Sequence, residues 1–209
     1  MEQEFLESLI PKRSKFLAEL REKSAREESY APIIEPQAEQ LLLTMLAASK
    51  PRRVLEIGTA VGYSAILMAE NLPEGSEIIT VERYKKHAEI AVDNIFAVGR
   101  EKQIRVIEGE AAEVLAWLDG EFDFIFLDAA KGQYLQFLPD IMRLLKNGGI
   151  LFSDDILYKG MVGDDDAVVR RKITIVKRLR AYLEAIMNHP GLTTAVIPIG
   201  DGVAISVKK

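Results

Sequence analysis

The stretch "VLEIGTAVGYS", residues Val54–Ser64, decides the fold because it joins a strand, a turn and the start of a helix. Its apolar beginning predicts a buried strand, and the residues that follow it have helical spacing. Between them, Gly58 and Gly62 permit a tight turn and a close approach of the backbone to a ligand. The helix directs its N-terminal amides toward the same place. The stretch therefore predicts a ligand site at the carboxyl end of a strand.

Four further apolar runs follow this unit, with amphipathic segments between them. The runs are "SEIITVE" (76–82), "KQIRVIEG" (102–109), "FDFIFLD" (122–128) and "GGILFSDD" (148–155). Short apolar runs that alternate with helical patterns are typical of repeated βα units around a parallel sheet. The five strands therefore predict a doubly wound α/β fold.

The two ends of the chain add helices and a hairpin to this core. Helical patterns cover 4–10, 14–25, 35–49 and, after the last parallel strand, 167–187. Two final apolar runs, 192–199 and 202–209, are joined by "GDG", which predicts an antiparallel hairpin at one edge of the sheet. We expect one domain over 1–209, with a helical cap over 1–50 and the core over 51–209. Trp117 is expected in the hydrophobic core.

Composition excludes several classes of protein. The chain has 209 residues, of which 48% are hydrophobic and 28% charged, and this is ordinary globular usage. It has no cysteine, which excludes a disulfide scaffold and a thiolate metal site or nucleophile. The net charge of −5 argues against a surface that binds nucleic acid everywhere, although it leaves room for a local basic patch. The first residues lack the apolar run of a signal peptide, so a cytoplasmic protein without membrane attachment is expected.

The acidic residues at two strand ends indicate the class of ligand. A dinucleotide fingerprint needs glycines at 58, 60 and 63, but Ala60 and Tyr63 occupy the last two positions. Glu82 ends the second strand, where a carboxylate can accept hydrogen bonds from both hydroxyls of a ribose. This combination predicts an adenosine-type ligand. The alternative is that Glu56 and Glu82 are solvated charges at strand ends.

Three further carboxylates lie at neighbouring strand ends. Asp128 follows the fourth strand, and Asp154 and Asp155 follow the fifth. A ligand set of oxygens alone favours a hard cation, Mg²⁺ above all, with Mn²⁺ or Ca²⁺ as alternatives. Consecutive residues of a regular strand point to opposite faces, so Asp154 and Asp155 can share an ion only if the chain bends there.

Five motifs together resemble a known family. They are "VLEIGTAVGYS", "VERYKKHAEIAVDNI", "VIEGEA", "FDFIFLDAAKGQY" and "GGILFSDDILYKG". They resemble the class I S-adenosylmethionine-dependent O-methyltransferases of the catechol and caffeoyl-CoA type, and within the bacterial branch the tRNA 5-hydroxyuridine methyltransferases. The resemblance implies a Rossmann-like seven-stranded, mostly parallel sheet, a homodimer, and S-adenosylmethionine and a divalent cation as cofactors. The metal-dependent family has Asp, Asp and Asn at the three metal positions, whereas this chain has Asp155 at the third.

The resemblance also implies the roles of individual residues. It places around the cofactor Ile34, Glu56, Gly58, Tyr63, Ser64, Glu82, Gly109, Glu110, Ala111 and Asp128. It makes Lys131 the general base beside Asp128, since a lysine near a bound cation has a lowered pKa. The plainer interpretation is that Lys131 only pairs with Asp128. Tyr158 is expected to stack on a flat acceptor.

The acceptor is predicted from a basic segment near the presumed site. The cluster comprises Arg170, Arg171, Lys172, Lys177, Arg178 and Arg180. Such a cluster can contact a phosphate backbone. Together with the resemblance, it favours a tRNA wobble hydroxyuridine as the acceptor, with phosphate contacts at Arg170 and Arg171 and a small phenol as the alternative acceptor. The plainer interpretation of the cluster is an amphipathic helix with a solvated basic face. Two other functions are less favoured than O-methyl transfer: an NAD-dependent dehydrogenase and a non-enzymatic nucleotide-binding protein. His87 and His189 are expected to be structural, with His87 facing solvent.

Overall fold

A computed structural model of the chain describes residues 5, 8–27 and 30–209, and its centre is a seven-stranded sheet. The strand order is β3-β2-β1-β4-β5-β7-β6. The first five strands are parallel, while β7 is antiparallel to both β5 and β6. The strands are β1 (Arg53–Ile57), β2 (Glu77–Glu82), β3 (Ile104–Glu108), β4 (Phe122–Leu127), β5 (Leu145–Ser153), β6 (Leu192–Ile197) and β7 (Val203–Lys208). The predicted doubly wound sheet with its C-terminal hairpin is confirmed.

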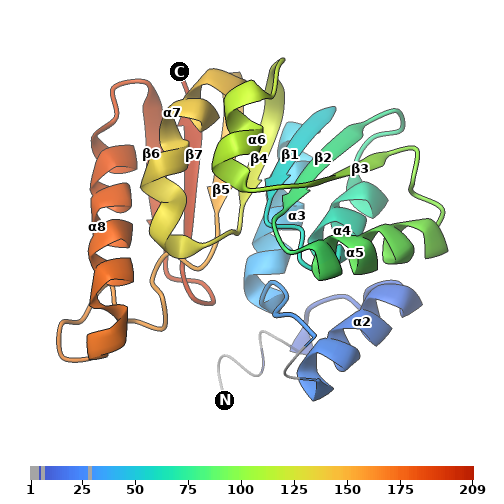
Figure 1. Cartoon of the computed structure of the whole chain (residues 1–209), viewed down its shortest axis with the longest axis horizontal. Coiled ribbons are helices and arrows are strands. Elements are labelled where there is room, and N and C mark those ends of the chain that lie inside the picture. The colour runs from blue at the N-terminus through green and yellow to red at the C-terminus, as the bar shows by residue number, and fades with distance from the viewer. Residues whose placement is uncertain (1–4, 6–7, 28–29) are drawn as a thin grey trace.

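Helices cover both faces of the sheet. Figure 1 shows α6, α7 and α8 in front of the sheet, α3 behind it, and α2 below the edge at which the parallel strands end. The helices are α2 (Lys15–Arg26), α3 (Pro36–Ser49), α4 (Tyr63–Asn71), α5 (Lys85–Ala97), α6 (Ala111–Trp117), α7 (Tyr134–Leu144) and α8 (Ile173–Asn188). Two short 3₁₀ turns, η1 (Lys131–Gln133) and η2 (Arg170–Lys172), precede α7 and α8. Among the described residues, no helix is long and apolar enough to cross a membrane.

The alternation of side chains in the parallel strands explains these two layers. Leu55 and Ile57 of β1 contribute to a core with α6, α7 and α8, whereas Val54 contributes to a second core with α2, α3 and α4. In β4, Ile125 joins the first core and Phe124 the second. A strand buried on both faces reads as a continuous apolar run, which is why these strands could be located in the sequence.

Three predictions about local structure need correction or fall outside the described residues. The helix expected from residue 167 begins at Ile173, because the preceding acidic residues form turns in which the Asp166 N–H donates to the Asp164 side chain at 2.9 Å. Arg170 therefore lies on η2, not on α8. Trp117 ends α6 and is 56% exposed, so its expected place in the core is wrong. The helix predicted over 4–10 lies partly outside the described residues, which leave out 4, 6 and 7.

Candidate functional site

The turn after β1 brings two neighbouring strands into direct contact. Gly58 has a φ of 109°, a value that residues with a side chain rarely adopt. A Cβ added there would overlap the carbonyl oxygen of Asp128. The N–H groups of Gly58 and Thr59 donate to the carbonyl of Val81 at 3.0 and 3.2 Å. The glycine thus allows the ends of β1, β2 and β4 to converge.

A cavity of about 310 Å³ lies over these converging strand ends. It is lined by residues from the ends of β1 to β4, from the segment after β5 and from the segment before α3. Of the predicted site residues, the cavity wall contains Ile34, Gly58, Tyr63, Ser64, Glu82, Gly109, Glu110, Ala111, Asp128, Lys131, Asp154 and Asp155. The structure therefore brings the expected cofactor residues and the expected metal residues into one space.

Glu82 is held in a fixed orientation at the end of β2. Its carboxylate accepts from the N–H of Ala60 at 2.9 Å and from the N–H of Tyr84 at 2.8 Å. It is 7% exposed, so the alternative of a solvated strand-end charge is wrong for this residue. Each carboxylate oxygen keeps a lone pair that can accept a further hydrogen bond from a ligand hydroxyl.

Glu56 lies below the cavity wall and not in it. The hydroxyls of Ser64 and Thr80 both donate to its carboxylate, and the side chain is fully buried. Burial raises the pKa of Glu56 to about 7, against the lowering effect of these two hydrogen bonds. Because Ser64 lines the cavity, Glu56 supports the wall through Ser64, and the solvated alternative is wrong here as well.

A second network, which the sequence analysis missed, supports the cavity wall at Tyr63 and Ile34. The buried Glu39 of α3 accepts from the Tyr63 hydroxyl at 2.7 Å and from the guanidinium groups of Arg13 and Arg21. Arg21 also donates to the Ile34 carbonyl at 3.1 Å and to the Tyr63 hydroxyl at 3.0 Å. An acid within the apolar "AEQLLL" of α3 was the available signal, since such a buried charge needs partners.

The carboxylates at the ends of β4 and β5 surround Lys131. Its ammonium group pairs with Asp128 and, at 3.0 Å, with Asp155, and donates to the Tyr134 hydroxyl at 3.1 Å. Burial alone lowers the pKa of Lys131, but the charges of Asp128, Tyr134 and Asp155 hold it well above its ordinary value. Burial, together with the charges of Asp128 and Asp155, raises the pKa of Asp154 to about 8. The site thus concentrates negative charge.

The bend required for Asp154 and Asp155 to share a ligand is present. Asp155 has a φ of 55°, and its N–H donates to the Asp154 side chain at 2.9 Å. The oxygen donors suit a hard divalent cation. Within the part of the chain that the structure describes, however, no three acidic or histidine side chains are arranged to enclose an ion. Lys131 is the cation between Asp128 and Asp155.

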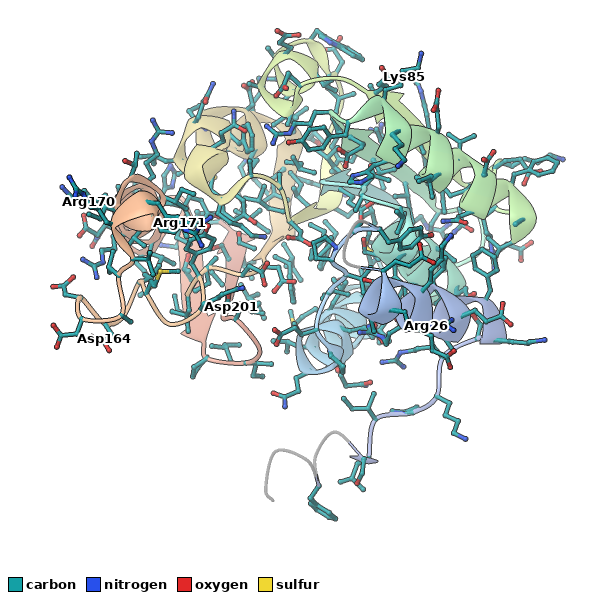
Figure 2. The ribbon with its side chains drawn as sticks, turned by 60° about the horizontal axis from the view of Figure 1, so that its bottom comes forward. Arg26, Lys85, Asp164, Arg170, Arg171 and Asp201 are labelled. Atoms are coloured by element: carbon teal, nitrogen blue, oxygen red, sulfur yellow. The ribbon has the colours of Figure 1, made fainter. Side chains whose placement is uncertain are left out.

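The expected acceptor residues lie outside the cavity wall. Tyr158 is partly buried, and the Lys172 ammonium lies 5.4 Å from its ring centre. Arg170 and Arg171 are exposed at the surface beside the start of α8 (Figure 2). His87, expected to face solvent, instead lines the cavity and contacts the Tyr84 ring edge to face, with ring centres 5.7 Å apart.

Comparisons with known proteins agree with this geometry. Residues 7–209 match the family model described as O-methyltransferase. The chain is 30% identical to a catechol O-methyltransferase from Niastella koreensis, over 84% of this chain and 82% of that protein. It is 29% identical to a caffeoyl-CoA O-methyltransferase from Medicago sativa, over 95% and 83% of the two chains.

A solved structure extends the agreement to the fold. The crystal structure of an O-methyltransferase from Bacillus cereus in complex with SAH, S-adenosylhomocysteine, superposes with a TM-score of 0.86 at 26% identity. The match covers 99% of this chain and 96% of that chain. The chain therefore belongs to the class I S-adenosylmethionine-dependent O-methyltransferases of the catechol and caffeoyl-CoA type.

Proposed function

We propose that this O-methyltransferase transfers the methyl group of S-adenosylmethionine to a hydroxyl of a small catechol-type phenol, with the help of a divalent cation. One observation carries the proposal: a single cavity contains both the glycine turn with Glu82 and the group formed by Asp128, Lys131, Asp154 and Asp155. The names of the relatives, which include a catechol and a caffeoyl-CoA enzyme, support a phenolic acceptor.

The donor half of the cavity would fix the cofactor. Glu82 would accept hydrogen bonds from the ribose hydroxyls, and Gly109, Glu110 and Ala111, which line the same cavity, would flank the adenine. Gly58, Tyr63 and Ser64 would surround the methionine end, and Ile34 would close over the sulfonium. Such a placement would align the methyl group with an acceptor oxygen near Asp128, and alignment supplies a large part of the rate of such a displacement.

The acceptor half would activate the hydroxyl. Asp128, Asp154 and Asp155 would hold the cation once the Lys131 ammonium no longer pairs with both Asp128 and Asp155, and a bound cation would lower the pKa of an acceptor hydroxyl. In the structure Lys131 is an ammonium whose pKa the charges of Asp128, Tyr134 and Asp155 hold above its ordinary value, against the lowering effect of burial. A cation that shared the charges of Asp128 and Asp155 would lower that pKa toward the range of a general base. Lys131, once neutral, would take the proton of the acceptor hydroxyl at Nζ as the acceptor oxygen bonds to the methyl carbon and the carbon–sulfur bond breaks.

A tRNA hydroxyuridine is the second candidate acceptor, because basic residues border the site. The Arg178 guanidinium donates to the Gly132 carbonyl of η1 at 3.4 Å, so the start of α8 lies beside the segment that carries Lys131. Arg170 and Arg171 are exposed there. Nothing in the names of the relatives supports this acceptor, and the phenol is therefore preferred.

The acceptor can be decided by parallel assays with purified protein, S-adenosylmethionine and Mg²⁺. We expect a catechol to be methylated, and Arg170→Ala with Arg171→Ala to leave that rate unchanged, since neither residue lines the cavity. Mass analysis of nucleosides from unmodified tRNA should show no new methoxyuridine. Methylation of tRNA alone, lost in the double variant, would reverse the assignment.

A further inference from the structure

The turn between β6 and β7 contacts the active-site segment after β5. The sequence "GDG" of this turn, residues 200–202, predicts a hairpin but no role in the site. In the structure the Asp201 side chain accepts from the backbone N–H of Lys159, and the Asp201 carbonyl accepts from the N–H of Leu157 at 2.8 Å. The carbonyl of Gly202 accepts from the N–H of Ile156 at 3.0 Å. The turn thus accepts hydrogen bonds from three backbone N–H groups of the segment that begins at Asp155.

That segment has an unfavourable backbone conformation. Asp155, Tyr158 and Lys159 have φ values of 55°, 49° and 58°, in the left-handed region where non-glycine residues are uncommon. Such a residue is strained, and its conformation persists only where the surrounding structure enforces it. The hydrogen bonds from the turn are the enforcing contacts at 156, 157 and 159.

Both glycines of the turn have a positive φ, and each lies close to a neighbouring side chain. Gly202 has a φ of 84°, and a Cβ there would overlap the Leu157 side chain. Gly200 has a φ of 57°, and a Cβ there would lie 2.8 Å from a carboxylate oxygen of Glu35, just before α3. The turn therefore fits closely between the start of α3 and the segment after β5, with Asp201 at its centre (Figure 2).

Asp201 does not line the cavity, but its contacts lead to a residue that does. Asp155 lines the cavity and pairs with Lys131 at 3.0 Å. The direction in which Asp155 projects depends on the left-handed backbone that the turn supports.

We propose that Asp201 is a positioning residue, whose hydrogen bond to the Lys159 N–H holds residues 155–160 in the conformation that turns Asp155 toward Lys131. Its effect on catalysis rests on the proposed function, since it requires Asp155 to take part in methyl transfer. Its effect on the conformation of the segment does not.

Two substitutions separate the hydrogen bond from the charge. Asp201→Ala removes the acceptor, and we expect kcat to fall by about 10- to 100-fold while the Kd for S-adenosylhomocysteine stays unchanged, because small misplacements of reacting groups cost this much. Asp201→Asn keeps an oxygen acceptor and should retain kcat within about threefold. Lys159→Ala is the matched control: it keeps the backbone N–H and should behave like the wild type.

A readout without an acceptor keeps this test independent of the proposed function. Lys159 is exposed, and limited trypsin digestion reports how often the bond after it becomes accessible. We expect Asp201→Ala to be cleaved there about tenfold faster than the wild type or Asp201→Asn, with the folded far-UV spectrum retained. Gly202→Ala, which displaces Leu157, should show the same faster cleavage, and it serves if Asp201→Ala does not fold.

The proposal is overturned if Asp201→Ala shows wild-type cleavage, or if Asp201→Asn is cleaved as fast as Asp201→Ala, since the charge and not the hydrogen bond would then matter. A wild type that methylates no phenol but shows the expected cleavage pattern rejects the proposed acceptor and leaves the positioning role supported.

Discussion

Gly58 shows how a single missing side chain allows the site to form. Its φ of 109° and the closeness of the Asp128 carbonyl leave no room for a Cβ. Gly58→Ala should lower the free energy of unfolding by about 3 kcal/mol through strain and overlap. Gly148→Ala is the control, because Gly148 also has a positive φ, 79°, but nothing within 4 Å of an added Cβ. Denaturant unfolding should show a loss of only about 1 kcal/mol there, and equal losses in both variants would contradict the steric argument.

At the same scale, the buried Glu56 predicts a pH dependence. Its pKa is about 7 in the folded chain against 4.5 as the ordinary value, so the folded state keeps a proton that the unfolded state has lost between these values. Stability from this group is therefore present below about pH 4.5 and is lost as pH rises through about 7, a change of roughly 3 kcal/mol. Glu56→Gln has no such proton. Between pH 5 and 8 the unfolding free energy of the wild type should fall relative to that of Glu56→Gln by a large part of this amount, and parallel curves would refute the assignment.

Among the elements, α2 shapes the cofactor wall from outside the cavity. Arg21 connects α2 to the Ile34 carbonyl and the Tyr63 hydroxyl, and both of these residues line the cavity. Isothermal titration should show that Arg21→Ala binds S-adenosylhomocysteine about tenfold more weakly than the wild type. This loss corresponds to the free energy of one charged hydrogen bond. Arg26→Ala is the control: Arg26 lies in the last turn of α2 and contacts Glu22 of the same helix, at its carbonyl (3.2 Å) and its carboxylate (3.8 Å), so the variant should bind like the wild type. Equal affinity in the two variants would show that α2 does not reach the cofactor.

At the scale of the whole molecule, the sheet and the strand-end residues could be predicted because they depend on local patterns. Buried parallel strands are continuous apolar runs, and their carboxyl ends must share one edge. The networks around the cavity could not be predicted, because their partners are distant in sequence: Glu39 and Tyr63 are 24 residues apart, and Lys159 and Asp201 are 42 apart. Trp117 was misplaced because an apolar residue type does not tell which side of a helix end it occupies.

The expected homodimer stays a prediction, because it rests on helices before residue 30, part of which lies outside the described residues. The described residues do contain the feature on which the proposed function rests: one cavity joins a donor half and a carboxylate half.

The measurement that tests this claim most directly is methyl transfer from labelled S-adenosylmethionine to a catechol by protein dialysed against EDTA. We expect a rate near background in EDTA, full recovery on addition of Mg²⁺, and a loss of about 100-fold or more in Asp128→Ala, which removes a carboxylate of the acceptor half. A transfer rate that is the same in EDTA and Mg²⁺, or an Asp128→Ala variant as active as the wild type, would contradict it.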